Sequence, residues 1–369
     1  MKLKIEELQE KVKDLVSKTH WAQTEIVNRE QQKQAFLQAH KSGEDWNPDF
    51  RFQKPETSEV KEEVQKGLEL ARSISEKDIE NAGFKVLDEE DLEEFFAECL
   101  RELGLYIDLT GKVDDREAWR EVNEEIWPMV SEEKYRESLE KIEGLENRAE
   151  EKVLKAEDVK ELFEEEIEGL GFEYNVEIRD VDGCHNIPEE KTLVVAKGSS
   201  GERLYSEREA KMLAKHEIFH VVRGVNGRNL SDTFSITGVH SPFYDKTEEG
   251  GAVLREHETD VNYSSKDFDY HLRLIAAYEI SQGKTLEKIA EKLIDLGASP
   301  ERSFYLITRN RKALRHHIYL SGLDDWEEKD REKLMIGKLN PKWTEKFWKE
   351  VEKGDFNRPE ISAEEVFEK

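Results

Sequence analysis

One helix is predicted by the stretch SEREAKMLAKHEIFHVVRGVNG (206–227), and the expected fold is arranged around it. Ser206 followed by Glu209 forms a capping-box pattern, which marks the start of a helix. Gly224 is a typical stop signal. We therefore expect one helix that begins at Ser206 and ends near Gly224.

The same stretch contains an HExxH motif formed by His216, Glu217 and His220. Because an α-helix has about 3.6 residues per turn, the two histidines project from one side, and both imidazoles can reach one metal ion. Glu217 lies beside them, where a carboxylate can accept a proton from a water that the metal activates. This pattern predicts a zinc metallopeptidase in which His216 and His220 bind Zn²⁺ and Glu217 is the general base.

An HExxH motif alone is only moderately specific, because five residues match by chance in many chains. The alternative is two hydrogen-bonded histidines on a buried helix. The flanking residues favour the metal site, since Met212 and Phe219 beside the histidines suit the floor of a cleft. The face opposite the histidines is apolar and carries Ala214, Ile218, Val221 and Val222.

A catalytic zinc needs a third protein ligand and an open position for water. This chain lacks the third His of the longer HExxHxxGxxH motif, because Arg223 and Asn226 occupy the positions of its Gly and its His. The stretch KTEEGGAVLREHETD (246–260) predicts a second helix that carries Glu248 and Glu249. A Glu on a following helix is the third ligand of gluzincin peptidases, so either residue is a candidate.

The expected fold class is α+β and mostly helical. We expect an N-terminal helical lobe at 1–170, a zincin-like catalytic core at 171–262 and a C-terminal helical lobe at 263–369. The core would combine a small sheet with the HExxH helix and the helix that bears the Glu ligand.

Local patterns support this division of the chain. The clearest helices of the N-terminal lobe are expected at 88–103, before Gly104, and at 130–145. The alternating and β-branched segments 174–180 and 192–198 predict two strands joined by a loop.

The chain is strongly acidic, with 369 residues and a formal net charge of −28. Such a charge disfavours nucleic acids and anionic membranes as partners. Only two cysteines, Cys99 and Cys184, are present, which excludes a disulfide framework. The N-terminus lacks the apolar run of a signal peptide and no stretch approaches a membrane span, so we expect a soluble, cytoplasmic protein.

The site is formed by HEIFHVVRGVNG (216–227) and TEEGGAVL (247–254), and these segments resemble the core of the tyrosine carboxypeptidase family. Members of that family include microtubule-associated enzymes that remove the C-terminal Tyr of α-tubulin. Three further segments are similar to elements of the family: WNPDFRF (46–52), HHIYLSGL (316–323) and KLMIGKL (333–339).

The resemblance implies that His216 and His220 bind the metal and that Glu217 is catalytic. It implies Glu249 as the third ligand, with Glu248 as the close alternative, and the C-terminal tail of a peptide or protein as substrate. The chain departs from the family pattern at one point, because two residues rather than three separate Glu217 from His220. We expect a regular helix to keep the metal site at this spacing and the substrate pocket to differ in shape.

A carboxypeptidase must also bind the terminal carboxylate of its substrate, and basic side chains do this. The candidate anchors are Arg223, Arg309, Arg315 and Lys338, and Glu248 is expected beside the substrate if Glu249 binds the metal. Tyr319, or a nearby His, is the candidate donor to the oxyanion. The alternative for these residues is ordinary surface charge, and for Arg223 a salt bridge to an acid.

These observations predict a zinc-dependent carboxypeptidase that removes a C-terminal residue, preferentially aromatic, from a peptide or protein tail. A zinc endopeptidase and a hydrolase of other amides are alternatives. A catalytically silent helical binding protein with the same fold is another. Loss of Glu217 or of the downstream Glu ligands would favour it, and neither is lost.

Overall fold

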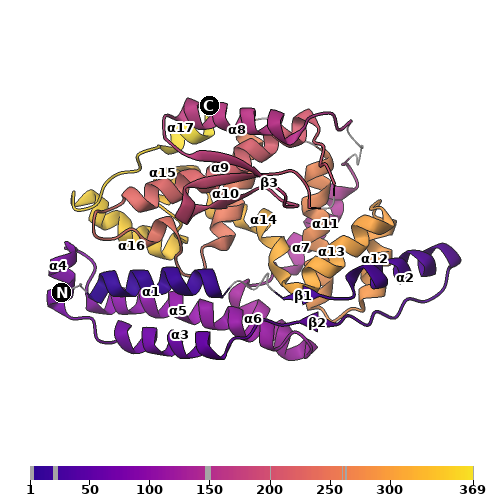
Figure 1. Ribbon diagram of the computed structural model, residues 1–369, viewed down its shortest axis with the longest axis horizontal. Coiled ribbons are helices and arrows are strands. Elements are labelled where there is room, and N and C mark those ends of the chain that lie inside the picture. The colour runs from indigo at the N-terminus through magenta and orange to yellow at the C-terminus, as the bar shows by residue number, and fades with distance from the viewer. Residues whose placement is uncertain are drawn as a thin grey trace.

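The protein is mostly helical, with two small β-sheets among the residues that the structure describes (Figure 1). A computed structural model describes residues 4–19, 24–145, 151–199, 201–259, 261 and 264–368. The predicted class, α+β and mostly helical, is confirmed. Within the described ranges, no helix combines the length and the apolar composition that a membrane span needs.

Among the N-terminal helices, α1, α3 and α5 lie side by side in one layer (Figure 1). The helices are α1 (Lys4–Lys18), α2 (Arg29–Ser42), α3 (Ser58–Ala71), α4 (Glu76–Ala82), α5 (Glu89–Gly111), α6 (Arg116–Ile126) and α7 (Glu132–Ile142). The helices predicted at 88–103 and 130–145 are confirmed as α5 and α7. The stop expected at Gly104 is wrong, because α5 continues with buried apolar residues whose packing outweighs the roughly 1 kcal/mol helix penalty of a glycine.

A three-stranded sheet packs against α8 (Ala156–Leu170), and its edge strand also contacts the helix that carries the HExxH motif. Its order is β3 (Asn175–Arg179), β5 (Thr192–Ala196) and β4 (His185–Ile187). β5 runs parallel to β3 and antiparallel to β4, and all of its residues are buried. The two predicted strands are confirmed, but the segment between them is not only a loop, because it contains the edge strand β4. The second sheet pairs β1 (Glu25–Ile26) with β2 (Phe52–Gln53).

Helix α9 (Glu207–Asn229) carries the HExxH motif and begins as predicted. The backbone N–H of Glu209 donates to the Ser206 hydroxyl at 3.1 Å. The predicted end at Gly224 is wrong, because α9 runs on to Asn229. Glycines here serve a close contact with the turn η3 (Ile236–Gly238), since a Cβ on Gly227 would lie 2.4 Å from the carbonyl oxygen of Thr237.

Helix α10 (Asp245–Glu258) lies between α9 on one side and α14 (Ile318–Ser321) with the turn η5 (Gly322–Asp325) on the other. The backbones of α10 and η5 touch at two glycines. A Cβ on Gly250 would lie 2.1 Å from the carbonyl carbon of Gly322. The position of α10, and therefore of the acidic residues next to Gly250, depends on this contact.

The remaining helices belong to the C-terminal part of the chain. They are α11 (Ser264–Ser281), α12 (Leu286–Asp295), α13 (Pro300–Lys312), η4 (Leu314–His317), η6 (Glu328–Asp330), α15 (Arg331–Leu334), α16 (Pro341–Glu352) and α17 (Ala363–Phe367). One buried cluster joins the N-terminal helices to the C-terminal ones, and a second joins α8, the sheet and α9 to the end of the chain. The division at residues 170 and 262 stays a prediction, and both clusters cross it.

The contact between Gly250 and Gly322 generates the first testable prediction. Gly250→Ala should lower the free energy of unfolding by about 1–3 kcal/mol, because the new Cβ meets backbone that cannot rotate away. Chemical denaturation measures this. The control is Gly169→Ala in α8, where a Cβ meets nothing within 4 Å. That change should stabilise the protein by about 1 kcal/mol. A similar gain at Gly250 would show that α10 is free to shift.

Candidate functional site

The structure brings His216, His220 and Glu249 together at the interface of α9 and α10. The two imidazole rings have centroids 4.9 Å apart. Oε2 of Glu249 lies 3.4 Å from Nε2 of His216 and 3.8 Å from Nε2 of His220. All three ligand atoms lie within 4.8 Å of one another. A metal ion with bonds of about 2.1 Å fits among atoms at these separations.

The chemistry of these three atoms also fits a cation. Oε2 of Glu249 is buried and has no hydrogen-bond partner among the described residues. Each imidazole uses Nδ1 for another carboxylate and directs Nε2 toward this oxygen. Burial lowers the pKa of His216, but Glu249 and Glu256 outweigh it and raise that pKa to about 10. The site therefore attracts positive charge, and two imidazole nitrogens with one carboxylate oxygen are a donor set that zinc prefers.

Arg315 holds Glu249 in place. Its Nη2 donates to Oε1 of Glu249 at 2.7 Å, and its Nε donates to Asp245 at 3.0 Å. Burial raises the pKa of Glu249, but Arg315 and His216 outweigh it, so this pKa lies well below its usual range. Glu249 is thus an anion, and Arg315 leaves its second oxygen free to face the histidines.

Glu248 lies next to Glu249 but contacts the other side of His220. The Nδ1–H of His220 donates to Oε1 of Glu248 at 3.0 Å. Arg223 donates to its other oxygen at 2.5 Å, and Nζ of Lys338 lies 3.5 Å away. Burial raises the pKa of Glu248, but Lys338 and Arg223 outweigh this effect and lower the pKa to about 2. Of the two carboxylates that the sequence leaves open, this geometry favours Glu249 as the ligand.

Arg223 is fully buried, and each of its three side-chain nitrogens has a partner. Besides the bond to Glu248, its Nε donates to the carbonyl of Leu334 at 3.2 Å and its Nη2 to that of Leu339 at 2.9 Å. Because the side chain is fully buried and every nitrogen is engaged, Arg223 is not accessible to a substrate. The sequence left two roles open for Arg223, a substrate anchor and a salt bridge to an acid. The structure shows the salt bridge, to Glu248.

Glu217 and Tyr319 lie beside the triad with their polar atoms unused. Neither side chain forms a hydrogen bond with another described residue. Burial raises the pKa of Glu217, and the adjacent histidines oppose this effect. A carboxylate with a raised pKa is the stronger base. The Tyr319 ring stacks on the His216 ring, with centroids 6.1 Å apart.

One residue of the site is missing from the sequence analysis. Glu256 is fully buried and accepts the Nδ1–H of His216 at 2.6 Å. It lies seven residues after Glu249, two turns along the same helix. This spacing places Glu256 on the same face of the helix as Glu249, and it is the sequence feature that predicts a role for Glu256 at the site.

The remaining predicted anchors differ in their surroundings. The side chain of Lys338 is only 8% exposed and lies against Glu248. Arg309 is exposed on α13 and donates to Nε2 of His316 at 3.3 Å. Lys338 therefore lies next to the carboxylate that holds His220, whereas no hydrogen bond or ion pair joins Arg309 to the triad among the described residues.

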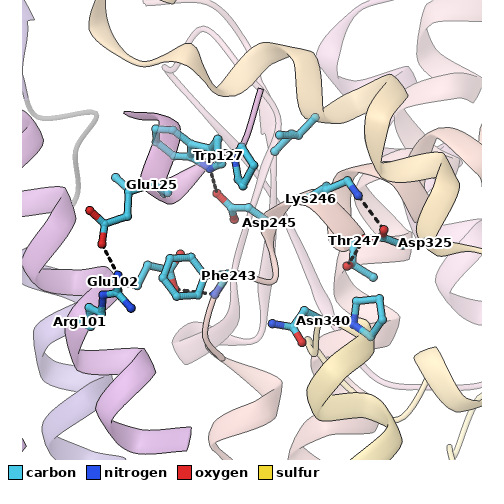
Figure 2. Close-up of a pocket in the computed structure, with 14 residues that line it drawn as sticks. Arg101, Glu102, Glu125, Trp127, Phe243, Asp245, Lys246, Thr247, Asp325 and Asn340 are labelled. Atoms are coloured by element: carbon cyan, nitrogen blue, oxygen red, sulfur yellow. Dashed lines mark hydrogen bonds and ion pairs between the residues drawn. The ribbon is translucent and has the colours of Figure 1, made fainter. Parts of the chain in front are cut away.

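Two cavities adjoin the N-terminal end of α10. One, of about 190 Å³, is lined by Val16, Thr19, Leu103, Tyr106, His240, Tyr244, Asp245 and Arg315. The other, of about 380 Å³, also reaches Asp245. Figure 2 shows how Trp127 donates to Asp245, while Lys246 and Thr247 are held by Asp325. Asp245 thus lines both cavities and accepts a hydrogen bond from Arg315, which also donates to Glu249.

The comparisons with known proteins bear on most of the chain. No curated protein and no solved structure is similar enough to count as a match. A family profile described as microtubule-associated tyrosine carboxypeptidase matches residues 41–312, which is most of the chain. This match confirms the resemblance that the site motifs carry. The chain belongs to the family of microtubule-associated tyrosine carboxypeptidases.

Proposed function

We propose that this protein is a zinc-dependent carboxypeptidase that removes one C-terminal residue, preferentially aromatic, from a peptide or protein tail. Membership of the family supports the reaction class. The observation that supports a bound metal ion is the position of Oε2 of Glu249. This oxygen is buried, has no hydrogen-bond partner among the described residues and faces two imidazole nitrogens. In this proposal His216, His220 and Glu249 hold the zinc ion.

The proposed catalytic core is zincin-like and lies at 171–262, between helical lobes at 1–170 and 263–369. When bound, zinc supplies a Lewis acid that polarises the scissile carbonyl and activates a water. The edge strand β4 packs against α9 and has one unpaired side among the described strands. An extended substrate can pair with such an edge through backbone hydrogen bonds.

Two residues of the chain carry the proton transfer and the charge stabilisation. Glu217 takes the proton from the attacking water and passes it to the leaving amine, because it is next to the ligands and has no other partner. The hydroxyl of Tyr319 donates a hydrogen bond to the oxyanion that develops on the carbonyl oxygen. Its stacking on His216 holds the phenol ring beside the metal site.

Lys338 is the proposed anchor for the terminal carboxylate. A chain with a net charge of −28 repels an anionic peptide end at long range, so binding needs a local positive group. Arg223 and Arg315 are engaged by Glu248 and Glu249, whereas Nζ of Lys338 is 3.5 Å from its nearest carboxylate oxygen. The 190 Å³ cavity next to Arg315 is the proposed pocket for the terminal side chain.

Metal content tests the ligand assignment. The wild-type protein should bind one zinc ion, and Glu249→Ala should lose it. Glu248→Ala should keep the ion but lower the free energy of unfolding by about 3–5 kcal/mol, because it leaves Arg223 buried without its carboxylate. Native mass spectrometry and chemical denaturation measure the two effects. If Glu248→Ala loses zinc and Glu249→Ala keeps it, the two roles are reversed.

Glu217→Gln tests the proton transfer. The variant should retain zinc and lose roughly 10²–10⁴-fold in kcat, since the amide cannot accept the proton. Single-turnover hydrolysis of a fluorogenic peptide measures this loss. The matched control is Glu207→Gln in the first turn of the same helix, which should leave kcat unchanged. Equal rates for wild type and Glu217→Gln would remove this residue from the mechanism.

The substrate mode is tested with one peptide that ends in Tyr, either free or amidated. We expect release of Tyr from the free peptide only. Lys338→Met should raise KM for the free peptide by roughly 10–100-fold, which corresponds to one lost charge-assisted hydrogen bond. Lys342→Met, on the exposed start of α16, is the control. Equal cleavage of both peptides, or cuts within the chain, would indicate an endopeptidase, and no cleavage by a zinc-loaded protein would indicate a silent binding protein.

A further inference from the structure

Glu256 is a carboxylate of α10 that the proposed catalytic steps do not use. It is fully buried at the interface of α10 with α9 and α11. Its Oε1 accepts two hydrogen bonds, from Nδ1 of His216 at 2.6 Å and from the hydroxyl of Tyr270 at 2.7 Å. Its Oε2 is buried and has no partner among the described residues.

The surroundings of Glu256 differ from those of the other two buried carboxylates on α10. Glu248 and Glu249 each form an ion pair with an arginine. Glu256 forms none with a lysine or arginine of the described chain, and its one ion-pair partner there is His216. A buried carboxylate is stable only when positive charge or donors face it. For Glu256 these donors are Nδ1–H of His216 and the hydroxyl of Tyr270, so both side chains stabilise the buried carboxylate.

The same hydrogen bond determines which nitrogen of His216 faces the metal site. With the proton on Nδ1 and directed at Glu256, the lone pair lies on Nε2, which points toward Oε2 of Glu249. The hydroxyl of Tyr270 donates to the same oxygen of Glu256 at 2.7 Å. The rings of Tyr270 and Tyr319 stack with centroids 5.3 Å apart, and Tyr319 in turn covers His216.

We propose that Tyr270 and Glu256 form a positioning pair that orients His216 for metal binding. The pair rests on the proposed zinc site and deepens it. Neither residue touches substrate or reacting atoms, so both act through His216. Tyr270 lies on α11, a helix that carries none of the three proposed ligands. Through Glu256, α11 therefore affects the orientation of His216 on α9. Carboxylates behind metal-bound histidines typically change metal affinity by 10–100-fold.

Zinc affinity of four variants tests the pair. Glu256→Gln should weaken zinc binding by roughly 10–100-fold, and Tyr270→Phe should weaken it by a smaller factor. The double variant should bind zinc no more weakly than Glu256→Gln, because Tyr270 acts only through Glu256. The control is Tyr278→Phe, the same substitution two turns later on α11, where the ring stacks on Tyr135 of α7. Competition with a chromophoric chelator measures the affinity of each protein.

Two further measurements separate positioning from packing. The melting temperature of the metal-free protein should change little in Tyr270→Phe. The visible absorption of the Co²⁺-substituted protein should shift in Tyr270→Phe and Glu256→Gln but not in Tyr278→Phe. A merely structural role would lower the melting temperature and leave the Co²⁺ spectrum unchanged.

Each outcome has one meaning. Losses that add in the double variant, or zinc affinities equal to wild type, would overturn the positioning pair. If Glu256→Gln fails to fold, Tyr270→Phe alone still tests it, because the hydroxyl is the only group removed. A wild-type protein that binds neither zinc nor Co²⁺ would instead overturn the proposed zinc site, and the inference with it.

Discussion

Helix α10 buries three carboxylates against α9, and an ionised carboxylate is costly to bury unless positive charge or hydrogen-bond donors face it. Their partners come from three other elements: an arginine and a histidine of α9, an arginine of η4 and a tyrosine of α11. Compensation of these charges therefore brings together helices that are far apart in sequence. The candidate metal centre lies at the oxygen of Glu249 that has no hydrogen-bond partner among the described residues and faces both imidazoles.

Close packing makes this arrangement possible. Glu249 reaches the histidines only if α10 lies near α9, and α10 is held there from behind by η5. Gly250 and Gly322 allow the two backbones to touch, and Gly227 does the same between α9 and η3. Atoms that are to share one ion must be placed within a few tenths of an ångström, and contacts without intervening side chains provide such rigid spacing.

Charge is distributed unevenly in this molecule. The chain carries a net charge of −28, yet arginines and a lysine surround the triad. Most of these cations hold the buried carboxylates of α10 and are therefore structural parts of the site. This explains why a count of basic residues in the sequence overestimates the groups that can anchor a substrate. Arg223, fully buried with every nitrogen bonded, is the clearest example.

The sequence alone established the elements whose signals are local. The capping box at Ser206, the spacing of His216 and His220, and the alternation at 174–180 act over a few residues, so the start of α9, its histidine face and β3 follow from them. The family motifs are local in the same sense. Glycine was the local signal that failed, because Gly104 and Gly224 indicate helix ends when only backbone propensity is considered.

Only the tertiary structure decided which acid faces the histidines and which cations are engaged. Glu248 and Glu249 are neighbours in sequence and equal in chemistry, but the turn of α10 directs one toward Nδ1 of His220 and the other toward both Nε2 atoms. The bond of Arg315 to Glu249 spans 66 residues, and that of Arg223 to Leu339 spans 116. Such contacts form only when separate helices pack, and packing depends on the shapes and charges of all the side chains between them, which no short pattern in the sequence encodes.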